Sequence, residues 1–237
     1  MLPAEFSSVL QAQSREDFGS EVERFSKRLG FDTFSAVAVL DRGLGKSEFF
    51  AVHNAPEAYQ EIAWDQSIGR RDPVMQHCKR ATVPIIWNRD TYESSGEGDL
   101  WERFASFGYR TGIAMALHLP EGRHFVLAVD RDQSLPRDST ELQRVVADLQ
   151  LFAVHAQDAA LRLLLPHVQQ AERPALTPRE LEVLRWTMEG KTAWEVGAIL
   201  GISERTAVLH VNNAMHKLGC VNKHQAVLKA LRLGLIH

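Results

Sequence analysis

The sequence has 237 residues, of which 45% are hydrophobic and 24% charged, with a formal net charge of −3, which indicates a soluble globular protein of one large or two ordinary domains. No run approaches the roughly eighteen apolar residues of a membrane span, and MLPAEFSSVL at the N-terminus is too short and too acidic for a signal peptide. The only cysteines, Cys78 and Cys220, match no metal or disulfide spacing, so we expect a cytoplasmic protein with free thiols.

The first 165 residues predict an α+β domain. The strand-like segments Gly112–Leu119 and His124–Asp130 meet at Glu121-Gly122, which indicates a hairpin. The alternation of helices and strands favours an α-β-α sandwich with an antiparallel sheet. The other expected strands cover residues 33–40, 48–53 and 83–86, and the expected helices cover 14–29, 56–68, 73–79 and about 100–107.

A long helix is expected over residues 139–165, where Pro166 ends it. Its apolar residues follow a three-four spacing that fits either a stripe in the domain core or a homodimer interface. The polar segment HVQQAERPA predicts a linker over 167–175, between a domain at 1–166 and a second at 176–237. The stripe consists of Leu142, Val145, Leu149, Phe152, Ala156, Ala159 and Leu163.

The two predicted domains differ in charge. From Pro174 onward there are eight Lys and Arg against five Asp and Glu, whereas the rest of the chain has nineteen against twenty-five. A basic small domain beside an acidic large one indicates a polyanionic partner for the C-terminus. The sequence has no Gly-rich phosphate loop, metal-spaced His/Cys cluster or nucleophile elbow. We therefore expect neither an enzyme nor a cofactor.

Four helices are indicated in the C-terminal domain by their capping residues. Each begins with Thr, Ser or Asn and stops at or shortly before a glycine: 177 to about 188, before Gly190; 192 to near 201; 203–219; and 222 to just before Gly234. Only Gly201-Ile202-Ser203 joins the second helix to the third, which is typical of a helix-turn-helix. The third helix has an apolar stripe of Ala207, Val211, Ala214 and Leu218, facing a core.

The opposite face of the third helix carries Arg205, Val208, Asn212 and His216, which together can read base edges in a major groove. An ordinary amphipathic helix is the alternative. The stretch LTPRELEVLRWTMEGKTAWEVGAILGISERTAVLHVNNAMHKLG resembles the helix-turn-helix of LuxR-type transcription factors, with Glu180, Leu184 and Gly190 at that family's most constant positions.

This resemblance implies that the third helix binds double-stranded DNA and that the start of the second helix lies near the phosphates. Where the family usually has Thr-Val-Lys-Phe-His, this chain has Thr-Ala-Val-Leu-His over 206–210. The lost lysine removes one phosphate or base contact, so we expect DNA binding to depend more on a homodimer that reads paired half-sites. The implied DNA-binding residues are Lys191, Thr192, Arg205, Thr206, Val208, Asn212, His216 and Lys217.

The N-terminal domain resembles the autoinducer-binding domain of LuxR-type quorum-sensing receptors, which bind N-acyl homoserine lactones. Asp72-Pro73 matches the family's Asp-Pro, whose carboxylate accepts the ligand amide N–H. Trp87 matches the tryptophan that packs over the lactone ring, and Gly112 matches the glycine ahead of the fourth strand. A buried carboxylate that faces an amide donor is physically sensible, because it is otherwise an unpaired charge.

The family's other polar anchors are altered. Tyr59 stands where the family has a tryptophan that donates to the lactone carbonyl, and its phenol can still donate. Ala63 replaces a tyrosine that donates to the acyl carbonyl, and Ala128 replaces a small polar residue on the last strand. Trp64 substitutes for the lost tyrosine only if the register slips; Tyr59 and Trp64 are alternatively core aromatics. The candidate sheet positions Ala36, Ala38, Ala114 and Ala116 predict a roomy pocket poor in donors.

The sequence therefore predicts a ligand-responsive bacterial transcription factor. Its N-terminal domain binds an N-acyl homoserine lactone with a bulky, branched or aryl acyl group, and its C-terminal domain binds palindromic promoter DNA as a dimer. Two alternatives stay open. The first is an orphan receptor for a small molecule that is not a lactone, which Ala63 and Ala128 favour. The second is a ligand-independent DNA-binding regulator whose N-terminal domain only dimerises.

Overall fold

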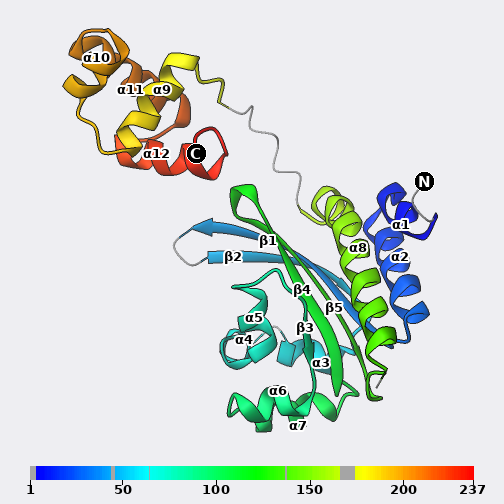
Figure 1. The fold of residues 1–237 in the computed structure, drawn as a ribbon. Coiled ribbons are helices and arrows are strands. Elements are labelled where there is room, and N and C mark those ends of the chain that lie inside the picture. Colours follow the sequence, from blue (N-terminus) through cyan, green and yellow to red (C-terminus); the bar gives the residue numbers. More distant parts are fainter. Residues whose placement is uncertain (1–3, 44–45, 64, 137, 166–173) are drawn as a thin grey trace. The chain divides into compact units, whose positions relative to one another are not determined.

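The computed structural model describes residues 4–43, 46–63, 65–136, 138–165 and 174–237 (Figure 1). The chain divides into two compact units, the first with residues 1–119 and 123–166 and the second with the C-terminal residues 167–237. Each unit has its own hydrophobic core. Within the described ranges, no helix has both the length and the apolar character needed to cross a membrane.

The first unit is built on a five-stranded sheet in the order β2-β1-β5-β4-β3. Every neighbouring pair is antiparallel, and the turn at 120–122 joins β4 to β5 as a hairpin. The predicted α+β class and antiparallel sheet are therefore confirmed. The strands are β1 (Thr33–Gly43), β2 (Lys46–His53), β3 (Ile85–Trp87), β4 (Thr111–Leu119) and β5 (Arg123–Arg131).

One face of the sheet is covered by α1 (Ala4–Ser8), a short 3-10 turn (Val9–Gln11), α2 (Arg15–Arg28) and α8 (Ser139–Leu163) (Figure 1). The predicted apolar stripe of α8 packs against this sheet face and α2, with Leu149 and Phe152 almost fully buried. Its interpretation as a homodimer interface is therefore wrong, because the chain's own core uses it. The exposed large apolar residues of α8 are Leu151 and Val154, 38% and 49% exposed.

The other face of the sheet is covered by α3 (Glu57–Ala63), α4 (Gln66–Arg71), α5 (Pro73–Cys78), α6 (Arg89–Ser94) and α7 (Gly98–Ala105). The single helix predicted over 56–68 is divided, because Asp65 caps a new helix by accepting a hydrogen bond from the Ser67 N–H at 2.7 Å. Helix α6 was not predicted, since it is short and polar and is set by the Asn88–Thr91 capping box rather than by apolar periodicity.

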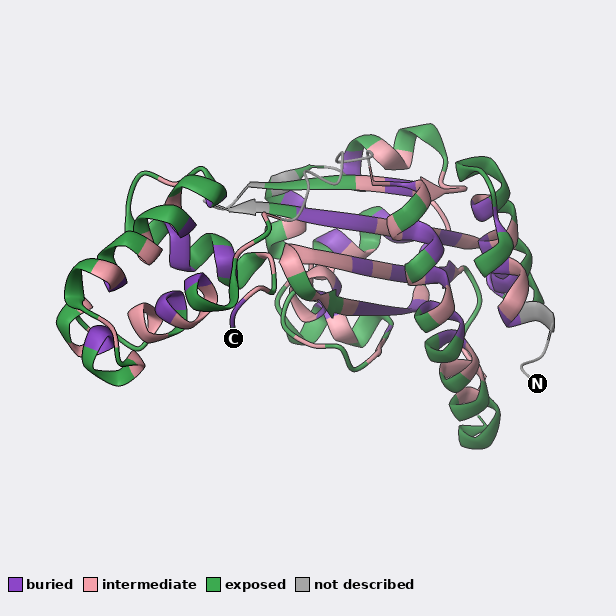
Figure 2. Ribbon diagram, turned by 90° about the horizontal axis from the view of Figure 1, so that it is seen from above, coloured by how far each residue is buried: buried purple, intermediate pink, exposed green. Residues whose placement is uncertain are grey.

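The second unit contains the four predicted helices: α9 (Pro178–Met188), α10 (Ala193–Leu200), α11 (Glu204–Leu218) and α12 (Lys223–Arg232). The three-residue turn between α10 and α11 is tight, since a Cβ on Gly197 would lie 2.8 Å from the Ile202 carbonyl oxygen. Ala207, Ala214 and Leu218 are buried as the stripe predicts. In Figure 2, burial in both units follows the inward faces of the helices and the strands of the sheet.

Candidate functional site

Asp72 lies at the junction of α4 and α5, where it ends one helix and begins the next. Its carboxylate accepts hydrogen bonds from the backbone N–H of Val74 at 2.8 Å and of Met75 at 3.4 Å. The Tyr92 hydroxyl donates a third at 3.1 Å. Pro73 suits the first position of α5, because an N–H there has no partner within the helix. Burial raises the pKa of Asp72, and the three hydrogen bonds oppose that rise.

Trp87, Gly112 and Asp130 lie side by side on β3, β4 and β5. The Trp87 indole N–H is close enough to the Asp130 carboxyl group to act on its ionisation as a hydrogen-bond donor. A Cβ on Gly112 would lie 2.5 Å from the Asp130 Oδ1 atom and 2.7 Å from the Trp87 Nε1 atom. Glycine is therefore needed at this position so that the indole can reach across β4 to the carboxyl group.

Asp130 is not among the predicted site residues, yet it is only 7% exposed and faces the same core as Asp72. Burial and the negative charge of Asp72 raise its pKa to about 8, against the opposing hydrogen bond from Trp87. The sequence signal that could have found it is the alternation of HFVLAVD, in which the carboxyl occupies an inward position beyond Ala128. The structure thus brings two carboxyl groups to one site.

Tyr59 also lies in this core, and its ring stacks on that of Tyr109 with centroids 3.9 Å apart. Phe104 meets the Tyr59 ring edge-on at 5.6 Å. Burial raises the pKa of Tyr59 well above its ordinary value, so its hydroxyl stays protonated and is able to donate. Burial also raises the pKa of Tyr109, and the nearby Thr33 side chain opposes that rise. The buried Tyr109 hydroxyl nevertheless has no partner with hydrogen-bond geometry among the described residues.

We call Asp72, Asp130, Tyr59, Trp87, Tyr92 and Tyr109 the inner cluster. Ala128 lies two residues before Asp130 on the same side of β5, so it faces the inner cluster, as do Ala114 and Ala116. The expectation that Ala36 and Ala38 also line this side is wrong, because they pair with Leu127 and Phe125 and belong to the core on the α8 side. The register of β1 decides this, and it cannot be read from β1 alone.

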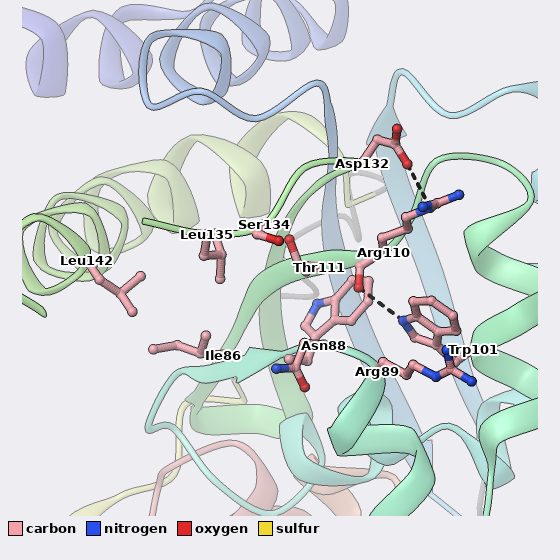
Figure 3. A pocket seen from close by; sticks show the side chains of 11 residues that line it. Ile86, Asn88, Arg89, Trp101, Arg110, Thr111, Asp132, Ser134, Leu135 and Leu142 are labelled. Atoms are coloured by element: carbon pink, nitrogen blue, oxygen red, sulfur yellow. Dashed lines mark hydrogen bonds and ion pairs between the residues drawn. The ribbon is translucent and has the colours of Figure 1, made fainter. Parts of the chain in front are cut away.

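The remaining predicted ligand residues are only partly placed. Ala63 is the last residue of α3, and Trp64 lies outside the described residues. The groove in Figure 3, about 490 Å³, shares only Trp87 with the inner cluster. Several of its polar side chains already have partners, since Arg110 binds Asp132 at 2.9 Å and the Trp101 indole donates to the Arg110 carbonyl at 3.1 Å. We therefore place the candidate ligand site at the inner cluster.

On α11, Arg205, Val208, Asn212 and His216 are all exposed on the face opposite the buried stripe. Their exposed side chains run from the first turn of the helix to its last. Thr206 is partly buried, and its hydroxyl lies 2.8 Å from that of the Ser203 cap. This face offers a guanidinium, an amide, an imidazole and an apolar side chain. Groups of these kinds can form hydrogen bonds and methyl contacts with base edges in a major groove.

The start of α10 is preorganised by a capping box, in which the Thr192 hydroxyl accepts from the Glu195 N–H. Lys191 lines a groove of about 310 Å³ together with Val208 and Asn212 of α11. Lys217 differs from the other predicted DNA-binding residues. Its ammonium donates to the buried Glu180 carboxylate at 2.8 Å and to the Ala175 carbonyl at 3.2 Å, so its hydrogen bonds hold α11 to the start of α9.

Each of the two units is similar in sequence to a known protein family. Residues 14–160 match the autoinducer-binding domain, and residues 174–230 match the luxR family of bacterial regulatory proteins. The transcriptional activator protein AnoR of Acinetobacter nosocomialis is 28% identical over 97% of this chain and 96% of its own length. The transcriptional activator protein SolR of Ralstonia nicotianae is 32% identical, with 95% and 94% covered.

Among solved structures, SdiA in complex with octanoyl-rac-glycerol superposes with a TM-score of 0.74 at 28% identity, covering 99% of this chain and 94% of that one. A crystal structure of Escherichia coli SdiA superposes with a TM-score of 0.73, also at 28% identity, covering 99% of this chain and 95% of that one. The similarity extends over both units and includes the segments that carry the inner cluster and α11. The chain therefore belongs to the luxR family of bacterial regulatory proteins, with an autoinducer-binding domain ahead of its helix-turn-helix.

Proposed function

We propose that this regulator binds an N-acyl homoserine lactone with a bulky, branched or aryl acyl group and responds by binding promoter DNA, without catalysing a reaction. The observation that carries the proposal is the Asp72 carboxylate, fixed by three donors at the inner cluster. A carboxylate held in this way has lone pairs left for a further donor, and a ligand amide N–H supplies one.

The other proposed ligand contacts follow from the inner cluster. Tyr59 supplies a protonated hydroxyl to a ligand carbonyl. Trp87 presents its ring to the lactone while its N–H is held by Asp130, and Gly112 makes that arrangement possible. Ala63 and Ala128 take little volume where the family usually has larger polar side chains, which leaves space for a wide acyl group. Trp64 is the remaining proposed contact.

The substitution Asp72→Asn tests the carboxylate. Asparagine can still cap α5 through its one oxygen, since all three donors bind Oδ1 of Asp72, but an NH2 group then replaces the second carboxylate oxygen and the ligand amide N–H loses its acceptor. We expect about fivefold to tenfold weaker binding of the best lactone, measured by titration calorimetry. Asp138→Asn is the matched control, because Asp138 caps α8 in the same way and is exposed. Equal affinity of the two variants would remove Asp72 from the ligand site.

We further propose that the chain works in the cytoplasm as a homodimer on a palindromic DNA site. Its proposed domains are 1–166 and 176–237, joined by a linker over 167–175 of which residues 167–173 lie outside the described ranges. The exposed face of α11 supports DNA contact through Arg205, Val208, Asn212 and His216, with Lys191, Thr192 and Thr206 beside it. Lys217 acts there indirectly, through its ion pair with Glu180.

Selection of bound duplexes from a random library tests the DNA proposal. A homodimer predicts an inverted repeat with half-sites about one helical turn apart, because the two recognition helices are related by a two-fold axis. Sedimentation of the protein with the selected duplex should give two chains per site. A single unrepeated site bound by one chain would contradict the proposal.

A second candidate is a receptor for an acyl ligand that is not a lactone. One observation favours it: the related SdiA has been solved with octanoyl-rac-glycerol, whose glycerol group carries hydroxyl donors. Two carboxyl groups at the inner cluster also suit a ligand with more than one donor. Thermal stabilisation by 1-octanoyl-glycerol but by no acyl homoserine lactone would select this candidate over the first.

A further inference from the structure

The side of the sheet that faces the inner cluster is apolar over the middle of strands β4 and β5. Strand β4 contributes Ala114 and Ala116, and strand β5 contributes Val126 and Ala128. Asp130 follows Ala128 on the same side of β5, with the Trp87 indole as its hydrogen-bond donor. A ligand that lies over Ala114, Ala116 and Ala128 therefore meets Asp130 as the neighbouring ionisable side chain, because His118 and His124 on the same side lie further along, toward the hairpin turn.

The number of donors around each carboxyl group decides which of the two holds a proton. Asp72 accepts from two backbone N–H groups and from the Tyr92 hydroxyl, all of which favour its ionised form. Asp130 has the Trp87 N–H and is the more deeply buried of the two. Two carboxyl groups that repel each other in a dry core titrate in steps, and the proton resides on the one with fewer donors.

We propose that Asp130 binds the signal in its protonated form and donates its carboxyl O–H to a carbonyl oxygen of the acyl amide, while the Asp72 carboxylate accepts the amide N–H. The inference rests on the proposed function and adds a ligand residue to it. Asp130 thereby supplies, from the sheet, a hydrogen bond that neither Ala63 nor Ala128 can make. A buried carboxylic acid kept neutral so that it can donate is a known catalytic device, here used for binding.

The groups that face Asp130 from the surrounding elements keep this proton in place at neutral pH. They raise its pKa to about 8 through burial and the charge of Asp72, and the Trp87 hydrogen bond opposes them. The nearby phenols stay neutral, because burial raises their pKa values too. Arg131, the next residue, directs its guanidinium to the Gly30 carbonyl and Phe31 instead. The facing groups are Asp72 before α5, Tyr59 on α3, Trp87 on β3, Tyr92 on α6 and Tyr109 before β4.

The test measures how the dissociation constants of two related ligands for the protein change between pH 6.5 and pH 9. The probes are the acyl homoserine lactone that binds best at pH 7 and the cyclopentylamide with the same acyl group, which keeps the amide but has no lactone to hydrolyse. For the wild-type protein we expect about tenfold weaker binding of the cyclopentylamide at pH 9 than at pH 7. At pH 9 only about one tenth of the protein molecules keep Asp130 protonated, whereas at pH 7 most of them do.

Three variants separate the proton of Asp130 from its other effects. Asp130→Asn keeps a donor and cannot titrate, so we expect binding within about threefold of wild type at pH 7 and no loss at pH 9. Asp130→Leu has no donor and should bind at least about fivefold more weakly at both pH values. Asp132→Asn removes an exposed carboxyl group two residues away and should keep the wild-type pH dependence.

The outcomes distinguish this inference from the function on which it rests. Binding of wild type at pH 7 with no change up to pH 9, or a pH dependence that persists in Asp130→Asn, overturns the role of the Asp130 proton and leaves the lactone receptor intact. Tighter binding at pH 9 would show that the ionised carboxylate is the binding form, which also overturns it. Failure of every probe to bind at pH 7 rejects the proposed function itself, and the inference with it.

Discussion

The contact between Trp87 and Asp130 across β4 predicts that Gly112→Ala is strongly destabilising. An alanine Cβ would lie 2.5 Å from both the Asp130 Oδ1 atom and the Val129 carbonyl oxygen. The side chains can move, but the Val129 carbonyl belongs to the central ladder between β4 and β5 and cannot. Forced overpacking typically costs about 1–3 kcal/mol. A clash with backbone places this substitution at the upper end, near 3 kcal/mol.

The assay is thermal unfolding of the full chain, followed by tryptophan fluorescence with Trp87 as a reporter inside the site. For a protein of this size, 1 kcal/mol corresponds to roughly 2–4 °C in Tm, so we expect Gly112→Ala to melt about 6–12 °C lower. Gly69→Ala is the matched control, because a Cβ there, in the middle of α4, meets nothing within 4 Å. Replacing a helical glycine by alanine should stabilise by about 0.5–1 kcal/mol. Equal melting temperatures for the two variants would refute the packing argument.

Three further predictions follow from the ion pairs and charges. The pKa of Asp130 is raised to about 8 from 3.8, so the folded protein holds a proton that the unfolded chain releases, and stability falls as the pH rises from 4 to 8. Asp130→Asn should abolish this loss, which amounts to about 4 kcal/mol between pH 5 and pH 8, in urea titrations at those two pH values. Glu180→Gln leaves the half-exposed Lys217 ammonium without its ion pair and should lower the stability of the helix-turn-helix unit by about 1–2 kcal/mol in calorimetry; an unchanged transition would show that the pair is only incidental. Arg205→Ala should weaken binding to the selected duplex and reduce the salt slope by about one if the guanidinium contacts phosphate, whereas relaxed sequence preference at an unchanged slope would assign it to a base.

The helix-turn-helix was predictable almost completely, because its helices are bounded by local signals. Capping boxes at Thr177 and Thr192 and the glycines at 201 and 219 form where the sequence places them. The apolar stripe of α11 is buried as its spacing predicts. What local signals did not predict is the partner of Lys217, since an ion pair between α9 and α11 depends on how those helices pack.

The ligand-binding unit was less predictable, because its site depends on strand register. The hairpin of β4 and β5 is apparent from a turn between two alternating segments, but the neighbours of β5 are not. Register decides that Ala36 and Ala38 face α8 and that Gly112 separates Trp87 from Asp130. Asp130 was missed for the same reason, since an acid at the end of a strand is usually solvent-exposed, and only the sheet and its helices show that it is buried.

The central claim is that the inner cluster binds an acyl amide signal. The most direct test is the melting temperature of the purified full chain with and without a panel of short-chain, long-chain, branched and aryl homoserine lactones, with 1-octanoyl-glycerol included. Because a ligand that binds only the folded state at a hundred times its Kd stabilises by about 2.7 kcal/mol, we predict a rise of several degrees with one lactone that has a wide acyl group. No rise with any lactone, from a protein that is folded and binds DNA, would contradict the account.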